Sequence, residues 1–333
     1  NKNITLVKIM GFKCGIVGLP NVGKSTLFNA LTESNKAEAA NYPFATIEPN
    51  IGRVAVPDQR LVTLTKIGKS EKTIPTYIDF VDIAGLVKGA SKGEGLGNKF
   101  LSHIREVDAI AHVVRCFEDK DITHVSNNVN PINDIDIIST EIKLADIENL
   151  QNRLNLLEKK SKQNDKEINN QLNIIKNLLK KLNNDEKINI SDVKKEDLSF
   201  YQSLNLISTK PMMYICNVDE KSILKGNEFS NKVEIQAQQE NADIVIVSAA
   251  IESQIAEFKN EEEKMELLKD LGLKETTLKK VINSGYNILS LITYFTCGPK
   301  ETRAWTITKN TTAPKAAGKI HSDFEKVLLE QKQ

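Results

Sequence analysis

The eight residues Gly18–Ser25 restrict the fold more than any other segment of this chain. They fit the pattern G-x-x-x-x-G-K-[S/T] at every fixed position, the apolar run Lys13–Val17 precedes them, and helix-forming residues follow. A loop between a strand and a helix surrounds a phosphate chain with backbone N–H groups and the positive end of the helix dipole. The spacing therefore predicts a phosphate-binding loop (P-loop), and the strand–loop–helix context argues against a chance glycine-rich turn. The residues expected to contact a nucleotide here are Asn21, Val22, Gly23, Lys24, Ser25 and Thr26.

Side chains suited to a magnesium ion occur in the P-loop and after it. Lys24 would contact the β- and γ-phosphates, while the Ser25 hydroxyl ligates Mg²⁺. Asp82 follows an apolar run, which is the position of the acid that holds Mg²⁺ through a water in P-loop proteins, so Asp82 is expected to have this role. The N–H of Gly85 would donate a hydrogen bond to the γ-phosphate. Thr46 is either a second hydroxyl ligand, bound only when the γ-phosphate is present, or an ordinary loop threonine.

A third motif concerns the base of the nucleotide. Asn217 follows another apolar run, where a GTPase carries N-K-x-D, but here Val218 and Glu220 replace the lysine and the aspartate. Guanine offers two N–H donors to a carboxylate, whereas adenine offers one amino donor beside an acceptor that would repel an identically placed carboxylate. The longer glutamate moves that charge, so the pattern favours adenine or at least weakens selection for guanine. Ser248 and Ala249, after a further apolar run, would form the other wall of the base pocket.

Short apolar runs alternate with helical stretches through residues 11–135 and 206–290. This alternation predicts an α/β domain with a mostly parallel sheet, the P-loop NTPase domain. Residues 252–271 form an acidic stretch that is predicted to be helical. The runs predicted to be strands are Lys13–Val17, Tyr77–Val81, Ala109–Val114, Met212–Cys216 and Asp243–Val247.

Residues 136–205 interrupt this pattern. They carry two seams of Ile and Leu at alternating spacings of three and four, typical of helices that pack as a coiled coil. We expect an inserted antiparallel helical hairpin, because each short seam needs a partner; one long bent helix is the alternative. Its many lysines are either a solvated face or a contact for RNA. Residues 291–333 contain Tyr, Phe, Thr and Trp in extended-looking pieces, which predict a small β-rich module.

Composition excludes several classes of function. The chain has 45 Lys+Arg against 44 Asp+Glu, so its net charge of +1 gives no general attraction to nucleic acid. No apolar run approaches the roughly 18 residues that a membrane helix needs, and no secretory signal is visible. The four cysteines are widely spaced, which favours buried thiols over disulfides or a metal site. We therefore expect a cytoplasmic protein that binds neither DNA nor a membrane.

Several segments closely resemble the YchF / Obg-like ATPase family of P-loop NTPases. The resemblance implies an ATPase that binds GTP more weakly, with Asn217 and Glu220 at the base, and a partner in the ribosome or ribosomal RNA. It further implies a C-terminal TGS (β-grasp) module and His124 as a catalytic helper. Analogy with related GTPases adds a potassium ion at Asn21. It also implies a hydrophobic residue, here Leu86, where related GTPases carry a water-orienting glutamine. The segments that carry the resemblance are Gly11–Thr32, Asn41–Asn50, Asp82–Glu106, His112–Asp119 and Tyr294–Ile307.

The two ends depart from the family pattern. Residues 1–9 precede Met10, where the family pattern usually starts, and residues 1–10 are expected to be an N-terminal extension. The sequence after Lys326 leaves the family pattern, so we expect an incomplete TGS module. Three functions remain in view. The first is a slow Mg²⁺-dependent ATP hydrolase with Lys24, Gly85 and His124 as catalytic residues. The second is a GTPase of the same fold, and the third is a nucleotide-gated module that binds RNA or the ribosome and hydrolyses nucleotide only incidentally.

Overall fold

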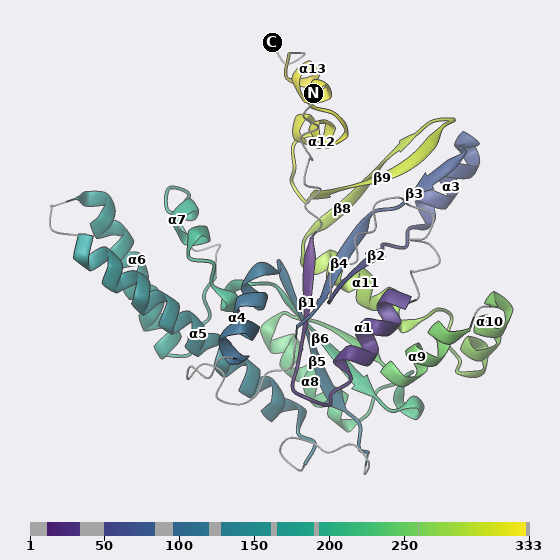
Figure 1. Ribbon diagram of the computed structural model, residues 1–333, viewed down its shortest axis with the longest axis horizontal. Helices are drawn as coiled ribbons and strands as arrows, with labels where there is room; N and C mark the ends of the chain where they lie inside the picture. The colour runs from purple at the N-terminus through teal and green to yellow at the C-terminus, as the bar shows by residue number, and fades with distance from the viewer. Residues whose placement is uncertain are drawn as a thin grey trace.

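The computed structural model describes residues 12–33, 50–83, 96–119, 128–160, 165–189, 193–258 and 260–330. In that part of the chain, strands and helices alternate from the P-loop onward, and a pair of long helices projects to one side (Figure 1). The strands are β1 (Lys13–Val17), β2 (Ile51–Ala55), β3 (Lys72–Ile74), β4 (Tyr77–Asp82), β5 (Ala109–Cys116), β6 (Met212–Val218), β7 (Asp243–Val247), β8 (Leu291–Cys297) and β9 (Glu301–Thr308).

The helices divide into those of the main domain, those of the insertion and those after β9. In the main domain they are α1 (Lys24–Glu33), α3 (Gln59–Gly68), α4 (Leu96–Glu106), η4 (Glu220–Ser222), α8 (Glu228–Glu240), α9 (Ala249–Glu257), α10 (Glu261–Asp270) and α11 (Thr277–Ile288). In the insertion they are α5 (Pro131–Lys160), α6 (Lys166–Asn183) and α7 (Leu198–Ser203), and η3 (Ile207–Thr209) follows where the chain returns to the main domain. After β9 come α12 (Ala313–Ile320) and α13 (Ser322–Glu330).

A six-stranded sheet in the order β2-β4-β1-β5-β6-β7 forms the centre of the molecule. Only β2 is antiparallel, so the prediction of a mostly parallel sheet is confirmed, and all five runs predicted to be strands are strands. Helices cover both faces, as parallel sheets require. Helix α11 packs on the face that carries Met213, while the next residue, Tyr214, points to the opposite face and donates a hydrogen bond to Glu240 of α8.

The register of the sheet determines which residues meet at its carboxyl edge. Ile16 of β1 pairs with Asp82 of β4, which brings the residues after β1 next to that carboxylate. Farther along the sheet, Asn217 of β6 pairs with Val247 of β7, so the loops after these two strands are neighbours. Ligands of open parallel sheets bind at this carboxyl edge.

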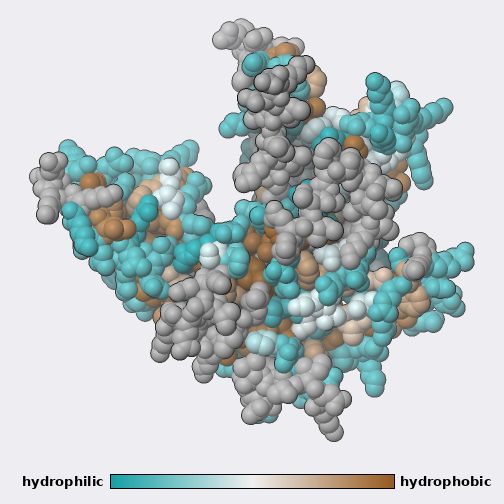
Figure 2. All heavy atoms as spheres, viewed as in Figure 1, coloured by the Kyte–Doolittle hydropathy of each residue, from teal (hydrophilic) through white to brown (hydrophobic). Residues whose placement is uncertain are grey.

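Two helices, α5 and α6, form an arm beside the sheet (Figure 1). Helix α5 begins at Pro131, inside the range assigned to the main domain, because its first turns place Ile135 and Ile138 in the central core. Its later turns pack on α6 around Leu150 and Ile175, both fully buried members of the two seams. Hydrophilic side chains cover most of the visible outer surface of this arm (Figure 2).

The base of the arm is fixed by a buried carboxylate. Asp146 of α5 accepts hydrogen bonds from the N–H of Ile207 at 3.0 Å and from the N–H and hydroxyl of Ser208 at 2.8 and 2.7 Å. A buried carboxylate is tolerated when several donors satisfy it, as here. Asp146 therefore ties α5 to the chain that returns from the arm to the sheet.

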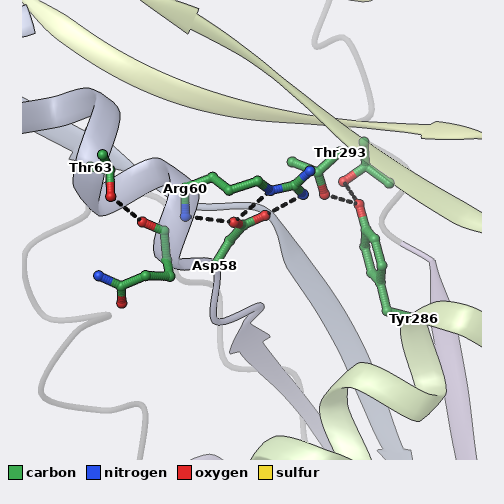
Figure 3. A network of polar contacts seen from close by, with 7 residues as sticks. Asp58, Arg60, Thr63, Tyr286 and Thr293 are labelled. Carbon is green, nitrogen blue, oxygen red and sulfur yellow. Dashed lines mark hydrogen bonds and ion pairs between the residues drawn. The ribbon is translucent and has the colours of Figure 1, made fainter. Parts of the chain in front are cut away.

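Strands β8 and β9 form an antiparallel hairpin that takes β3 as its third strand, in the order β3-β9-β8. The hairpin lies along α3, and Arg60 of that helix places its guanidinium 5.1 Å from the ring centre of Phe295. Figure 3 shows how Arg60 is itself held by Asp58, and how the hydroxyl of Tyr286 reaches Thr293 at 2.8 Å. The C-terminal strands are thus attached to the main domain by a shared sheet and by side chains from α3 and α11.

The acidic stretch 252–271 is helical for most of its length, as predicted, and is divided between two helices. It contains the end of α9 and a separate helix, α10, which Asn260 caps by accepting a hydrogen bond from Glu262 N at 3.0 Å. Asparagine favours such caps because its side chain replaces a missing backbone acceptor.

In the described residues, none of the helices has the length and apolarity that crossing a lipid bilayer would demand.

Candidate nucleotide-binding site

The P-loop follows β1 and turns tightly before α1. Gly18 and Gly23 have positive φ angles of 159° and 95°, and a Cβ at Gly23 would lie 2.3 Å from Asn217 Nδ2. A Cβ at Gly18 would lie 2.5 Å from the carbonyl oxygen of Val113, so neither position accepts a larger residue without movement. Asn21 also adopts a left-handed conformation, with φ 60°. The loop is therefore built around glycines at the two positions that the motif fixes.

Lys24 is buried inside this loop rather than extended into water. Its Nζ donates a hydrogen bond to the carbonyl oxygen of Leu19 at 2.7 Å, and only 7% of the residue is exposed. Burial lowers the pKa of Lys24 from 10.5 to about 8, while the negative charge of Asp82 acts in the opposite direction. The ammonium group is held within the turn, where the phosphates of a nucleotide would satisfy it.

The hydroxyl of Ser25 and the carboxylate of Asp82 lie side by side at the mouth of the loop. Ser25 Oγ donates to Asp82 Oδ2 at 3.3 Å, and the other oxygen, Asp82 Oδ1, is buried without a partner in the described part of the chain. A hydroxyl and an unpaired carboxylate oxygen are hard oxygen ligands, which Mg²⁺ prefers. These two residues therefore fit a magnesium ion that also contacts a phosphate chain.

Asn217 joins the P-loop to the loop after β7. Its Nδ2 donates to the carbonyl oxygen of Val22 at 2.9 Å, and its Oδ1 accepts the N–H of Ala249 at 2.9 Å. The side chain is buried and both ends are used, so in this arrangement Asn217 fixes two walls of the site. The motif predicted that Asn217 belongs to the site, but no sequence signal showed that it holds the P-loop itself.

The remaining predicted base contacts lie around the same edge. Val218 is buried, and Glu220, the first residue of η4, is exposed. Ser248 is buried, and its hydroxyl has no hydrogen-bond partner among the described residues. Thr26 is exposed on the first turn of α1. The structure thus brings the predicted P-loop, magnesium and base residues to one edge of the sheet, apart from those outside the described residues: Thr46, Gly85, Leu86 and His124.

Sequence patterns did not single out His112 on β5 as a polar group near the site. It is 1% exposed, and neither ring nitrogen has a partner in the described part of the chain. Burial and, as the smaller cause, the charge of Lys24 together lower its pKa from 6.5 to about 3, so the imidazole is neutral. Its ring lies 5.6 Å from that of Tyr214. A histidine within a strand of apolar residues gives no signal that distinguishes it from a core residue.

The site combines three features at the carboxyl edge of a parallel sheet: a glycine-rich turn with a buried lysine, a Ser–Asp pair suited to Mg²⁺, and the residues expected at the base of a nucleotide. Together they define a P-loop nucleoside triphosphatase. A family model described as "50S ribosome-binding GTPase" matches residues 13–143. A second model, YchF-GTPase_C, described as a protein of unknown function, matches residues 291–332.

Comparison with individual proteins narrows this class. The chain is 55% identical to the "Ribosome-binding ATPase YchF" of Haemophilus influenzae over 96% of its length and 87% of that protein's. It is 50% identical to the protein of the same name from Bacillus subtilis, with the same coverage of both chains. The solved structure of the Schizosaccharomyces pombe YchF GTPase aligns with a TM-score of 0.83 and 41% identity, over 95% of this chain and 86% of that one. This chain belongs to the YchF family.

Proposed function

We propose that this protein is a Mg²⁺-dependent nucleoside triphosphatase that prefers ATP to GTP and acts as a nucleotide-switched factor on ribosomes. The observation that carries the proposal is the buried Lys24 within the Gly18–Ser25 turn, beside the Ser25–Asp82 pair. The names of the bacterial relatives, which describe ribosome-binding ATPases, support the nucleotide and the partner. A ribosome-associated role would place the protein in the cytoplasm.

Binding of a triphosphate would change the partners of Lys24. Its Nζ now donates to the carbonyl of Leu19, and phosphate oxygens would replace that neutral acceptor with a charged one. The backbone N–H groups of the turn and the first turn of α1 would supply further donors. Magnesium, held by Ser25 and Asp82, would neutralise charge on the β- and γ-phosphates. We also propose that the Thr46 hydroxyl is a further Mg²⁺ ligand and that the N–H of Gly85 bonds the γ-phosphate. A potassium ion at Asn21 is the last part of the proposal.

Magnesium dependence is tested with Asp82→Asn. The amide keeps the shape of the side chain but removes the charge, so the gain in ATP affinity on adding Mg²⁺ should fall at least tenfold. Affinity measured in EDTA should stay within about threefold of the natural protein, because the P-loop amides and Lys24 remain. An unchanged magnesium effect would remove Asp82 from the metal site.

Adenine preference is assigned to Glu220. Asn217 already uses its amide to hold Val22 and Ala249. The exposed carboxylate of Glu220, the acid of the N-x-x-E motif, is therefore the proposed base contact. Calorimetry with non-hydrolysable ATP and GTP analogues should show tighter ATP binding, and Glu220→Asp should shift the ratio of affinities toward GTP. Tighter GTP binding that Glu220→Asp leaves unchanged would reject this assignment.

A GTPase is the second candidate, because the matched family model and the S. pombe protein both carry that description. The same calorimetry separates the two candidates. A third, a nucleotide-gated binding module, is favoured by Leu86, since leucine cannot orient water by hydrogen bonds. Single-turnover kinetics with and without ribosomes decides between a switch enzyme, which ribosomes should accelerate strongly, and incidental hydrolysis. His124→Ala tests the proposed catalytic helper in the same assay.

Ribosomal RNA is the proposed contact for the helical arm. Lys176 and Lys180 are exposed on α6, although Lys176 also lies 3.5 Å from Glu158. Replacing exposed lysines of α6 with glutamine should weaken ribosome association and flatten its salt dependence. Unchanged association would mean that these lysines form only a solvated face.

We propose that the C-terminal strands and helices belong to a TGS module.

A further inference from the structure

Two carboxylates follow Asn217 in close succession, and only one can be the acid that contacts the base. Asp219 and Glu220 are both exposed at the end of β6, beside the loop after β7. Selectivity for adenine or guanine depends on where a single carboxylate sits, because the two bases differ in donors and acceptors along one edge. The structure distinguishes the two acids by their partners.

Both carboxylate oxygens of Asp219 contact Ser222. Its Oδ1 accepts the N–H of Ser222 at 3.1 Å, and the Ser222 hydroxyl lies 3.1 Å from Oδ1 and 3.0 Å from Oδ2. The carbonyl oxygen of Asp219 also accepts the Ser222 N–H, at 3.1 Å. We call this set of contacts the Asp219–Ser222 clasp. Both carboxylate oxygens of Asp219 are directed to it, so this acid caps the turn.

Glu220 is in the opposite situation. It is the first residue of η4, the short turn that Asp219 caps, and its side-chain carboxylate makes no hydrogen bond or ion pair with another described residue. The turn continues to Gly226, whose N–H bonds the carbonyl oxygen of Ser222 at 2.7 Å. A capped turn restricts the backbone of its first residue, which lowers the entropy lost when the side chain is placed against a ligand.

We propose that Asp219 and Ser222 are positioning residues for base selectivity: their clasp holds the η4 turn so that Glu220 is the carboxylate presented to the base. Neither residue touches the base itself. This inference rests on the proposed function in one respect, the assignment of the base contact to Glu220. It adds that an acid one residue earlier is withdrawn from the base and that a serine outside the motif contributes to selectivity.

The test compares three variants with the unmutated protein. In each, the measured quantity is the ratio of the affinity for fluorescent ADP to the affinity for fluorescent GDP. Asp219→Asn keeps a side-chain oxygen that accepts from Ser222 and removes the charge, so the ratio should stay within about twofold. Asp219→Ala and Ser222→Ala both break the clasp and should reduce the ratio about fivefold to tenfold. Tripolyphosphate affinity should be unchanged in all three, because the P-loop is untouched. A merely structural defect would weaken tripolyphosphate as well.

Two outcomes measured on the variants overturn the proposal. A large change of the ratio in Asp219→Asn would make Asp219 a direct base contact, and an unchanged ratio in both alanine variants would leave the clasp without a role. Ser222→Ala, a small change at a half-buried residue of the turn, is the control for misfolding in Asp219→Ala. If the unmutated protein binds GDP more tightly than ADP, only the proposed preference for ATP is overturned. The clasp proposal then predicts that the two alanine variants reduce the preference for GDP by the same factor. Equal binding of both bases would overturn both inferences.

Discussion

Replacing Lys24 with methionine should stabilise the nucleotide-free protein while abolishing its response to nucleotide. The pKa of Lys24 is lowered from 10.5 to about 8 by burial, which corresponds to roughly 3 kcal/mol of lost stability at neutral pH. Methionine has a similar length and no charge, so it removes this penalty but also the hydrogen bond to Leu19, worth about 1 kcal/mol. The net gain should be about 1–2 kcal/mol in the free energy of unfolding.

The pH dependence gives the prediction a distinctive sign. Below pH 8 the lysine is protonated in both the folded and the unfolded state, so the burial penalty is present in full. Between pH 8 and about 10.5 the folded protein releases the proton while the unfolded chain keeps it, so the natural protein gains stability as the pH rises. The advantage of Lys24→Met should therefore be largest at pH 7 and shrink toward pH 10.

Urea unfolding followed by circular dichroism at pH 7, 8.5 and 9.5 measures this advantage, with exposed Lys232→Met as the matched control. Saturating Mg·ATP should stabilise the natural protein by about 3 kcal/mol at a hundred times its Kd, and should leave Lys24→Met unchanged. The order of stability of the two proteins should thus reverse when nucleotide is added. A variant that is less stable at pH 7, with a gap that does not vary with pH, would refute the reasoning about burial. Retained tight ATP binding would contradict the assignment of the P-loop.

Three further changes test the surroundings of the site. Asn217→Ala should lower the free energy of unfolding by about 2–4 kcal/mol and weaken ATP and GTP alike, because two buried bonds of 2.9 Å are lost; urea unfolding and calorimetry measure both effects. Asp146→Ala should destabilise the base of the helical arm by about 3 kcal/mol, seen as faster amide exchange in residues 204–210, and equal exchange would contradict its role. Glu252, which is buried beside Thr277, has a raised pKa, so folding favours its protonated form. Glu252→Gln should therefore be more stable than the natural protein at pH 7, by a margin that narrows as the pH falls toward 5.

Prediction from the sequence succeeded where a local pattern reports a local structure. The run Lys13–Val17 and the motif after it define both a strand and the loop that follows, because the glycines and the lysine act within a few residues of one another. The same holds for Asp82, whose position at the end of a strand follows from the apolar residues before it. Patterns of this kind need no knowledge of distant contacts.

Features that depend on distant partners were not accessible in this way. Strand β3 has only three residues and exists because it pairs with β9, more than two hundred positions later. The burial of Lys24 and its bond to Leu19 depend on how the turn closes, and the double role of Asn217 depends on two loops meeting. The contrast between Asp219 and Glu220 likewise comes from the geometry of a turn, since the sequence shows only two adjacent acids.

The attachment of β9 to β3 has a consequence for how the chain is made. Ser70, just before β3, donates a hydrogen bond to the carbonyl oxygen of Gly298, which lies 228 positions away. At about 5–20 residues per second, synthesis of the intervening chain takes on the order of 10–45 s, and during this time residues 72–74 have no β9 to pair with. Because they lack the partner that makes them a strand, their backbone N–H and C=O groups are open to chaperones or neighbouring chains until the C-terminal hairpin is made.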